Sequence, residues 1–597
     1  MKRTARTALR REPSPSKPAA GIAEAGPAAL ADAFDQRFKA NLARMTSGVS
    51  PAGMFAVYAN WIAHLTLAPG KRVQLARQAA VSAAALSHYA LRAAFDTQIP
   101  PLIEPSAGDK RFADEAWRRW PFNVTMQSFL LTQDWWANAS SGIDGLAPED
   151  ARAVSFLVRQ ALDRAAPSNF LATNPVILEA TIEERGANLA RGAQHVAEDA
   201  SRMLAGDPPV GAERFIVGRD VAVAPGKVVY RNHLIELLQY APSTATVHAE
   251  PVLIVPAWIM KYYVLDLSPH NSLVKHLVDQ GHTVFMVSWR NPDEKDRDLG
   301  LDDYRSLGIG AALEAVGKLA PGRKVHAAGY CLGGTLLAIE AAAMAGRGDD
   351  RLASLSLLAA QTDFTEAGEL TLFMRESEVA YLEALMRGQG YLSGRQMAGA
   401  FQMLRSNDLV WSRLVHDYML GRRFEMTDFM AWNADVTRMP ARMHAEYLRK
   451  LYLNNDLAAG RYMVDGSPVR LADIRIPIFA VGTERDHVAP WRSVYKITFC
   501  AAETDVTFLL ASGGHNTGIV AAPGDPRASY KVRKTSADER YVDPSAWQEA
   551  APRVEGSWWL QWHSWLAAHS TTRVEAHDRT SLPTSLGDAP GIYVLQR

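Results

Sequence analysis

Cysteine is scarce in this chain of 597 residues, which contains only Cys331 and Cys500. Two cysteines in so long a chain cannot form the disulfide framework that many secreted proteins use. The composition therefore favours a reducing compartment, and we expect the protein in the cytoplasm. With so few thiols present, the sequence around each cysteine becomes informative.

Net charge and long apolar runs are lacking as well. The 64 Lys and Arg residues balance the 64 Asp and Glu residues, so we expect no nucleic-acid partner. No stretch approaches the ~18 to 20 uninterrupted apolar residues of a membrane span. Neither a metal-ligand cluster nor a glycine-rich nucleotide loop stands out, so we predict no metal and no cofactor.

The chain divides into three regions of different pattern. Residues 1–27 are basic and rich in Pro and Ser, which predicts a disordered tail. Residues 28–213 carry helical periodicity with Pro and Gly breaks, which predicts a separate helical N-terminal domain. From 214 to 597, short apolar runs alternate with helical stretches, as in a doubly wound, mostly parallel sheet.

This alternation stops between about 365 and 450, in a helical segment rich in Met and aromatic residues. Such a composition would also suit plain core packing. Its position inside the sheet region, after the strand that precedes Cys331 and the next strand, favours a helical cap inserted over an active site.

Cys331 lies at the tip of a glycine turn. The sequence Gly-Tyr-Cys-Leu-Gly at 329–333 follows a short apolar run and precedes an Ala-rich helical stretch. In α/β-hydrolases, the G-x-S-x-G turn presents a nucleophile between a strand and a helix, and glycines permit the close packing. We therefore predict an α/β-hydrolase fold with Cys331 as nucleophile; a buried structural cysteine is the alternative.

Hydrolases of this fold place the acid and the histidine after later strands, in that order. Asp486 follows the apolar run IPIFAVG, and His515 lies in the glycine-rich loop ASGGHNTG. The inserted helices explain the long interval before Asp486. His487 is a competitor, and Asp486 could be a solvated turn residue, but chain order favours Cys331, Asp486 and His515.

Two backbone N–H groups are expected to bind the oxyanion. One belongs to Leu332, which follows the nucleophile, and the other comes from the loop after VLIVP, near Trp258 and Ile259. We assign this second position to Ile259.

A cysteine nucleophile suits acyl transfer from a thioester. A thiolate paired with histidine attacks well near neutral pH, and its acyl adduct is again a thioester. The acyl group therefore stays activated for attack by a hydroxyl, whereas a serine ester would dissipate that driving force. The pattern favours an acyltransferase, without identifying the acceptor.

The sequence also resembles the polyhydroxyalkanoate synthases, most closely the single-subunit type, from about residue 110 to the end. The matching stretches include VGRDVAVAPGKVVYRNHLIELLQY, KYYVLDLSPHNSLVKHLVDQGHTVFMVSWRNPD, GYCLGGT, SNDLVW and VGTERDHVAPW. The resemblance implies polymerisation of (R)-3-hydroxyacyl-CoA, with short-chain 3-hydroxybutyryl-CoA as the expected substrate, and release of CoA.

By the same resemblance, Cys331 carries the acyl group, His515 is the general base, and Asp486 helps activate the 3-hydroxyl. Trp411 in SNDLVW matches a recurrent tryptophan, which could equally be a core residue. A polyester granule surface and a second copy of the chain, as a homodimer, are the expected partners. The His loop and the segment PAWIMKYY depart from the usual pattern, which leaves chain-length preference open.

Two alternatives remain at this point. A thioesterase or depolymerase of the same fold would pass the acyl group to water. A non-catalytic granule-associated protein would use its apolar helices for binding alone. Cys500, in VYKITFCAAETD, is expected to be a structural residue on a helix.

Overall fold

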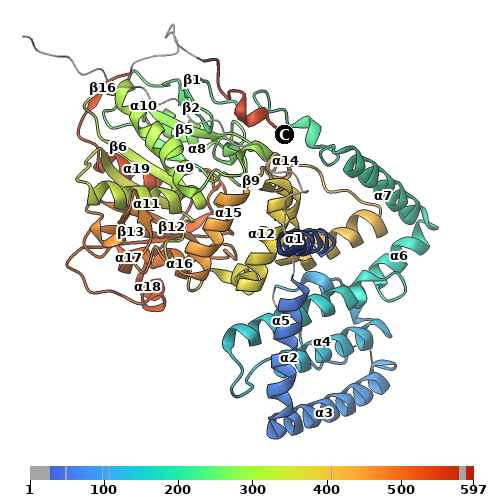
Figure 1. Ribbon diagram of the computed structural model, residues 1–597. Helices are drawn as coiled ribbons and strands as arrows, with labels where there is room; N and C mark the ends of the chain where they lie inside the picture. The colour runs from blue at the N-terminus through green and yellow to red at the C-terminus, as the bar shows by residue number, and fades with distance from the viewer. Residues whose placement is uncertain (1–26, 47–49, 97, 107, 405, 577–585) are drawn as a thin grey trace, which may run out of the picture.

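The computed structural model describes residues 27–597 except 47–49, 97, 107, 405 and 577–585 (Figure 1). The predicted disordered tail, apart from Pro27, lies outside these residues. The described elements before the first strand are all helical, as the periodicity predicted. The α-helices there are α1 (Pro27–Met45), α2 (Pro51–Thr66), α3 (Pro69–Ala93), α4 (Phe122–Ala139), α5 (Pro148–Ala165), α6 (Pro175–Glu183) and α7 (Ala187–Ala205).

A mixed sheet forms the centre of the rest of the molecule. Its strands lie in the order β1-β2-β5-β4-β6-β7-β12-β13-β14-β15. The neighbours from β5 to β13 are parallel, and antiparallel strands complete both edges. The strand bounds are β1 (Gly226–Arg231), β2 (Ile235–Tyr240), β4 (Val252–Val255), β5 (Val284–Trp289), β6 (Val325–Tyr330), β7 (Leu352–Leu358), β12 (Ile478–Thr483), β13 (Val506–Ala511), β14 (Ser529–Thr535) and β15 (Arg553–Glu555).

The central strands are apolar on both faces because helices cover them. Every residue of β4, β5, β6, β12 and β13 is buried, as expected for parallel strands between helical layers. The helices of this region are α8 (Leu273–Asp279), α9 (Leu301–Asp303), α10 (Ala311–Leu319), α11 (Leu332–Gly346), α16 (Trp491–Tyr495), α17 (Ile497–Cys500), α18 (Pro544–Ala550) and α19 (Trp559–Ala568). The architecture is the predicted α/β-hydrolase fold.

The chain between β7 and β12 is mainly helical. It contains α12 (Glu376–Gln389), α13 (Gly394–Leu404), α14 (Asp428–Ala434) and α15 (Ala441–Tyr447), together with π-helical turns η10 (Asn407–Trp411), η11 (Leu414–Met419) and η12 (Leu448–Leu453). Short strands β8 (Tyr391–Leu392) and β9 (Met439–Pro440) pair within it, as do β10 (Met463–Val464) and β11 (Ser467–Pro468) closer to β12. We call residues 365–453 the inserted segment.

The N-terminal helices pack on the inserted segment. Helix α1 lies against α12, where Ala43 is buried with Tyr381 and Leu385 (Figure 1). Helix α7 lies against η11, where the side-chain amide of Asn188 donates to the Met419 carbonyl oxygen at 2.8 Å. The helical N-terminal region is therefore joined to the sheet domain largely through this insertion.

The C-terminal part of the chain returns to the sheet edge. Strand β16 (Arg573–Glu575) pairs with β3 (Thr246–His248). Farther on, the fully buried carboxylate of Glu236 on β2 accepts the backbone N–H groups of Ile592 and Tyr593, both at 2.9 Å. Within the described residues, no helix combines the length and hydropathy that crossing a membrane requires.

Candidate active site

Cys331 occupies a strained turn between β6 and α11. Its φ of 51° and ψ of −123° lie in a region that residues other than glycine rarely adopt. Such a conformation costs roughly 1–3 kcal/mol and persists only where the surroundings hold it. Here the backbone N–H of Cys331 donates to the Leu358 carbonyl oxygen on β7 at 2.9 Å. The side chain is thereby presented at the carboxyl end of the central strand.

The glycines around Cys331 are required by close backbone packing. A Cβ on Gly333 would collide with the carbonyl oxygens of Val255 and Pro256 at the end of β4, and one on Gly334 would collide with Ala360. The N-terminus of α11 is thus pressed against the loop that follows β4. This contact brings the Leu332 backbone N–H, which begins the helix and has no intrahelical acceptor, beside that loop.

Asp486 and His515 meet beside Cys331. Asp486 lies in the loop after β12, where its Oδ1 accepts the backbone N–H groups of Val488 and Ala489, both at 2.8 Å. Its Oδ2 accepts from His515 Nδ1 at 2.7 Å and from the Thr483 hydroxyl at 3.2 Å. This bond leaves the other ring nitrogen of His515 free for the Cys331 thiol.

The charges of this cluster shift its pKa values. Burial alone would lower the pKa of His515, but the negative charges of Asp486 and Cys331 and their hydrogen bonds raise it well above its usual value. Burial alone would raise the pKa of Asp486, but His515 and the two backbone N–H donors lower it. The cluster therefore favours a carboxylate beside an imidazolium, which is the form that stabilises a thiolate.

This pKa shift predicts how stability depends on pH. Because the folded-state pKa of His515 is raised, its contribution to the free energy of unfolding is fully present below about pH 6.5 and falls as pH rises through the folded pKa. We expect the stability difference between the native protein and His515→Gln to shrink above about pH 6.5, by up to roughly 1.4 kcal/mol per pH unit. Denaturant unfolding measured from pH 5 to 9 would check this.

His326 supplies a control, because its pKa shifts in the opposite direction from that of His515. It is buried at the other end of β6, and burial lowers its pKa to about 4. The difference in free energy of unfolding between the native protein and His326→Gln should therefore change below about pH 6.5. In that range His326 takes up a proton in the unfolded chain before it does so in the folded protein. If the difference in free energy of unfolding between the native protein and His515→Gln stayed constant above pH 6.5, the raised pKa of His515 would be contradicted.

Two buried tyrosines of the inserted segment lie within the electrostatic influence of Cys331, and sequence reasoning missed them. Tyr447 ends α15 and Tyr452 lies in η12, with their hydroxyl groups 3.5 Å apart. Burial raises the pKa of both phenols, and the charge of Cys331 adds to the shift, to about 12 for Tyr452. The only signal in the sequence was the aromatic richness of the segment.

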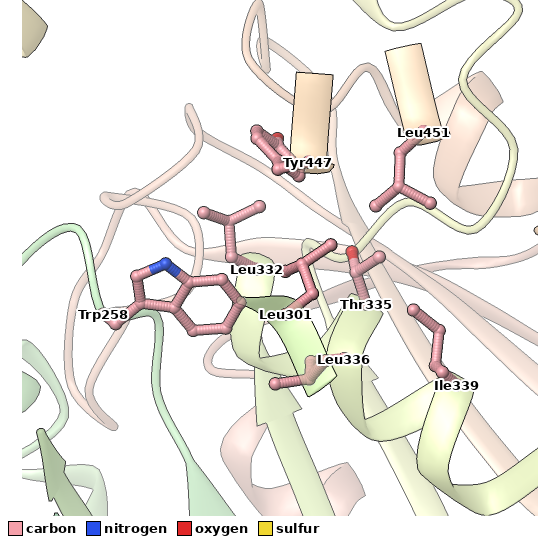
Figure 2. Close-up of a pocket in the computed structure, with 8 residues that line it drawn as sticks. All are labelled: Trp258, Leu301, Leu332, Thr335, Leu336, Ile339, Tyr447 and Leu451. Carbon is pink, nitrogen blue, oxygen red and sulfur yellow. The ribbon is translucent and has the colours of Figure 1, made fainter. Parts of the chain in front are cut away.

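A small cavity lies between α11 and the inserted segment (Figure 2). Its volume of about 10 Å³ is close to the space that one water molecule needs. It is lined by Trp258, Leu301, Leu332, Thr335, Leu336, Ile339, Tyr447 and Leu451. The cavity is therefore apolar and adjoins the turn that carries Cys331.

The loop with the expected second oxyanion donor, Ile259, is held from two sides. On one side, Thr437 of the inserted segment donates to the Trp258 carbonyl oxygen at 2.6 Å, and Met260 forms a bridge with Val436. The insertion thus contacts the residues on both sides of Ile259.

On the other side, Gln596, which is far along the chain, reaches the same loop. Its backbone oxygen accepts from the buried Lys261 Nζ at 2.5 Å, and its side-chain oxygen accepts the Asn291 N–H at 3.1 Å. Nothing in the sequence indicated this contact between distant segments.

The other residues singled out in the sequence lie outside this cluster. Cys500 is the last residue of α17, and burial raises the pKa of its thiol to about 12. Trp411 ends η10, which packs against α5. The imidazole that hydrogen-bonds Asp486 belongs to His515 and not to the neighbouring His487.

Among the described residues, no group of three or more His, Cys, Asp or Glu side chains is arranged to hold a metal ion.

Three family models match the chain. Residues 108–277 match the N-terminus of poly-beta-hydroxybutyrate polymerase, and residues 29–71 match a second N-terminal model of the same polymerase. Residues 250–521, which contain Cys331, Asp486 and His515, match the alpha/beta hydrolase fold. The models thus cover both the helical region and the sheet.

Curated relatives match over most of their length. A poly(3-hydroxyalkanoate) polymerase of Methylorubrum extorquens is 41% identical, over 88% of this chain and 87% of that protein. The polymerase subunit PhaC of Rhizobium meliloti is 40% identical over 82% and 80%, and that of Cupriavidus necator is 36% identical over 81% and 83%. The chain belongs to the poly(3-hydroxyalkanoate) polymerase family.

Proposed function

We propose that the protein polymerises (R)-3-hydroxyacyl-CoA into polyester and releases CoA. The observation that carries this is the cluster of Cys331, His515 and Asp486 in a chain whose relatives are named poly(3-hydroxyalkanoate) polymerases. Because the nucleophile is cysteine and not serine, the bound acyl group is held as a thioester. It therefore stays activated for transfer to a hydroxyl.

The first step is acylation of Cys331. His515 takes the thiol proton, and the thiolate attacks the carbonyl carbon of the hydroxyacyl thioester. The oxyanion that forms is bound by the backbone N–H groups of Leu332 and Ile259. The bond to the CoA sulfur then breaks, and the CoA thiolate leaves with the proton held by His515. CoA is substrate carrier and product, and the mechanism needs no cofactor.

The second step lengthens the ester chain. The 3-hydroxyl of a bound unit gives its proton to His515 or Asp486 and attacks the carbonyl carbon of an acyl thioester. An ester C–O bond forms, the C–S bond breaks, and the sulfur takes up the proton. Each cycle adds one unit and releases one CoA.

Water must be excluded from the site, because it would otherwise hydrolyse the acyl thioester before the 3-hydroxyl attacks it. Tyr447 of the inserted segment lines the cavity together with Leu332, the residue after the nucleophile, and Cys331 itself is only 9% exposed. In this proposal, the inserted segment is a cap that shields the acyl thioester from hydrolysis.

Exposed apolar side chains support a granule surface as partner. On and near α2 and α3, Phe55, Leu67, Leu91 and Phe95 are between 73% and 93% exposed. Side chains of this kind favour contact with an apolar surface. The expected homodimer belongs to the same proposal.

The test is CoA release from (R)-3-hydroxybutyryl-CoA by the purified protein, with products separated by size. A high-mass polyester formed with stoichiometric CoA is the expected result. Free 3-hydroxybutyrate as the main product would instead make the protein a thioesterase. A lack of CoA release from acyl chains of any length would favour a non-catalytic granule protein.

A further inference from the structure

The cavity between α11 and the inserted segment adjoins the turn that carries Cys331, because Leu332 is one of its lining residues. Leu332 follows Cys331 directly, and Tyr447 lies close enough for the Cys331 charge to shift the pKa of its phenol. Both side chains line the cavity, with Trp258 beside Leu332 (Figure 2). The cavity therefore lies one residue away from the cysteine that carries the acyl group in the proposed function.

The walls of the cavity suit a small alkyl group. Leu301, Leu336, Ile339 and Leu451 are aliphatic. The hydroxyl of Thr335 donates to the Gln361 carbonyl oxygen at 2.7 Å, and the hydroxyl of Tyr447 donates to that of Tyr452 at 3.5 Å. The volume of about 10 Å³ is close to the space that one water molecule needs, and a methyl group is of similar size.

One wall carries an unused hydrogen-bond donor. Trp258 is 3% exposed, and among the described residues its Nε1 has no hydrogen-bond partner. The neighbouring Trp289, by contrast, donates from Nε1 to the Pro256 carbonyl oxygen at 2.8 Å. Buried donors are usually paired, so the Trp258 N–H is available to a ligand oxygen that enters the cavity.

We propose that this cavity receives the C3 substituent of the acyl group on Cys331, while Trp258 Nε1 donates to the 3-oxygen. A carbon that carries both a methyl group and an oxygen matches an apolar cavity with an unpaired donor on its wall. The inference rests on the proposed function and makes Trp258, Leu336 and Ile339 determinants of specificity. The protein then selects 3-hydroxyacyl groups with a methyl-sized substituent.

Two adjacent leucines of α11 test the size limit. Leu336 lines the cavity and Leu337 does not, although both are buried. The native protein should prefer 3-hydroxybutyryl-CoA to 3-hydroxyhexanoyl-CoA, as judged by kcat/KM for CoA release. Leu336→Ala should shift that ratio toward the longer substrate by about tenfold or more, whereas Leu337→Ala should leave it unchanged. Equal ratios in all three proteins would overturn the proposal.

If Leu336→Ala does not fold, Ile339→Val removes a single methyl group from the same wall. It should shift the ratio toward 3-hydroxyvaleryl-CoA, the substrate that is one carbon longer. If the ratio of kcat/KM values were unchanged in Ile339→Val, the proposed role of the cavity would be refuted, as it would be by an unchanged ratio in Leu336→Ala.

The donor is tested with Trp258→Phe, which keeps the ring and removes the N–H. Single-turnover CoA release should fall about fivefold with 3-hydroxybutyryl-CoA and should stay the same with butyryl-CoA, which lacks the 3-hydroxyl. An equal loss with both substrates would show a packing effect and refute the hydrogen bond. A native protein that released no CoA from any of these thioesters would instead refute the proposed function.

Discussion

Cys331→Ala is expected to lower kcat for CoA release by about 10⁴-fold or more. The substitution removes the atom that accepts the acyl group, so only binding and the oxyanion donors remain. His515 and Asp486 cannot compensate, because they act on the thiol and the hydroxyl. Steady-state release of CoA from (R)-3-hydroxybutyryl-CoA, followed with a thiol reagent, measures the loss.

Cys500→Ala is the matched control, since it removes the other cysteine, which is half-buried at the end of α17. Its kcat should stay within the range of the native protein. A second variant, Cys331→Ser, keeps a nucleophile but stores the acyl group as an ester, so any product should be hydrolytic. CoA release by Cys331→Ala at a rate near the native one would end the proposed mechanism.

Asp486→Asn is expected to lower kcat by about 10³- to 10⁴-fold while the protein stays folded. The carboxylate accepts His515 Nδ1–H and raises the pKa of the imidazole through its charge. An amide at this position can turn its NH₂ group toward the ring and fix the wrong tautomer, as happens in triads. The pH profile of kcat should shift with the lower His515 pKa.

Asp266→Asn supplies the comparison for Asp486. Asp266 is also buried, and burial raises its pKa to about 6, but its partner is the Ser272 hydroxyl at 2.8 Å. Its replacement should leave kcat and the pH profile largely unaltered. If both variants lost activity to the same extent, the role of Asp486 would be structural.

The sequence was sufficient to predict the parts of the site that follow from chain order. The strands before Cys331, Asp486 and His515 are short apolar runs, and parallel strands place their carboxyl ends along one edge of the sheet. The loops that follow them must therefore meet. The edge strands β14 and β15 were not predicted, because their sequences SYKVRKT and RVE are mostly polar and contain no apolar run.

The rest of the site depends on contacts between distant segments. The placement of Tyr447 beside Cys331 follows from how the inserted segment folds back over α11, which no local periodicity encodes. The same holds for the hydrogen bonds of Gln596 to Lys261 and Asn291. Local pattern specifies helices and strands, whereas tertiary packing decides which of their faces meet.

The contact between Gln596 and Lys261 has a consequence for the order of events during synthesis. The two residues are 335 positions apart, and a ribosome adding about 5 to 20 residues per second needs tens of seconds to cover that distance. Throughout this interval, the loop around Ile259 lacks the bonds that Gln596 supplies. The nascent chain therefore completes this side of the site only after Gln596 has emerged.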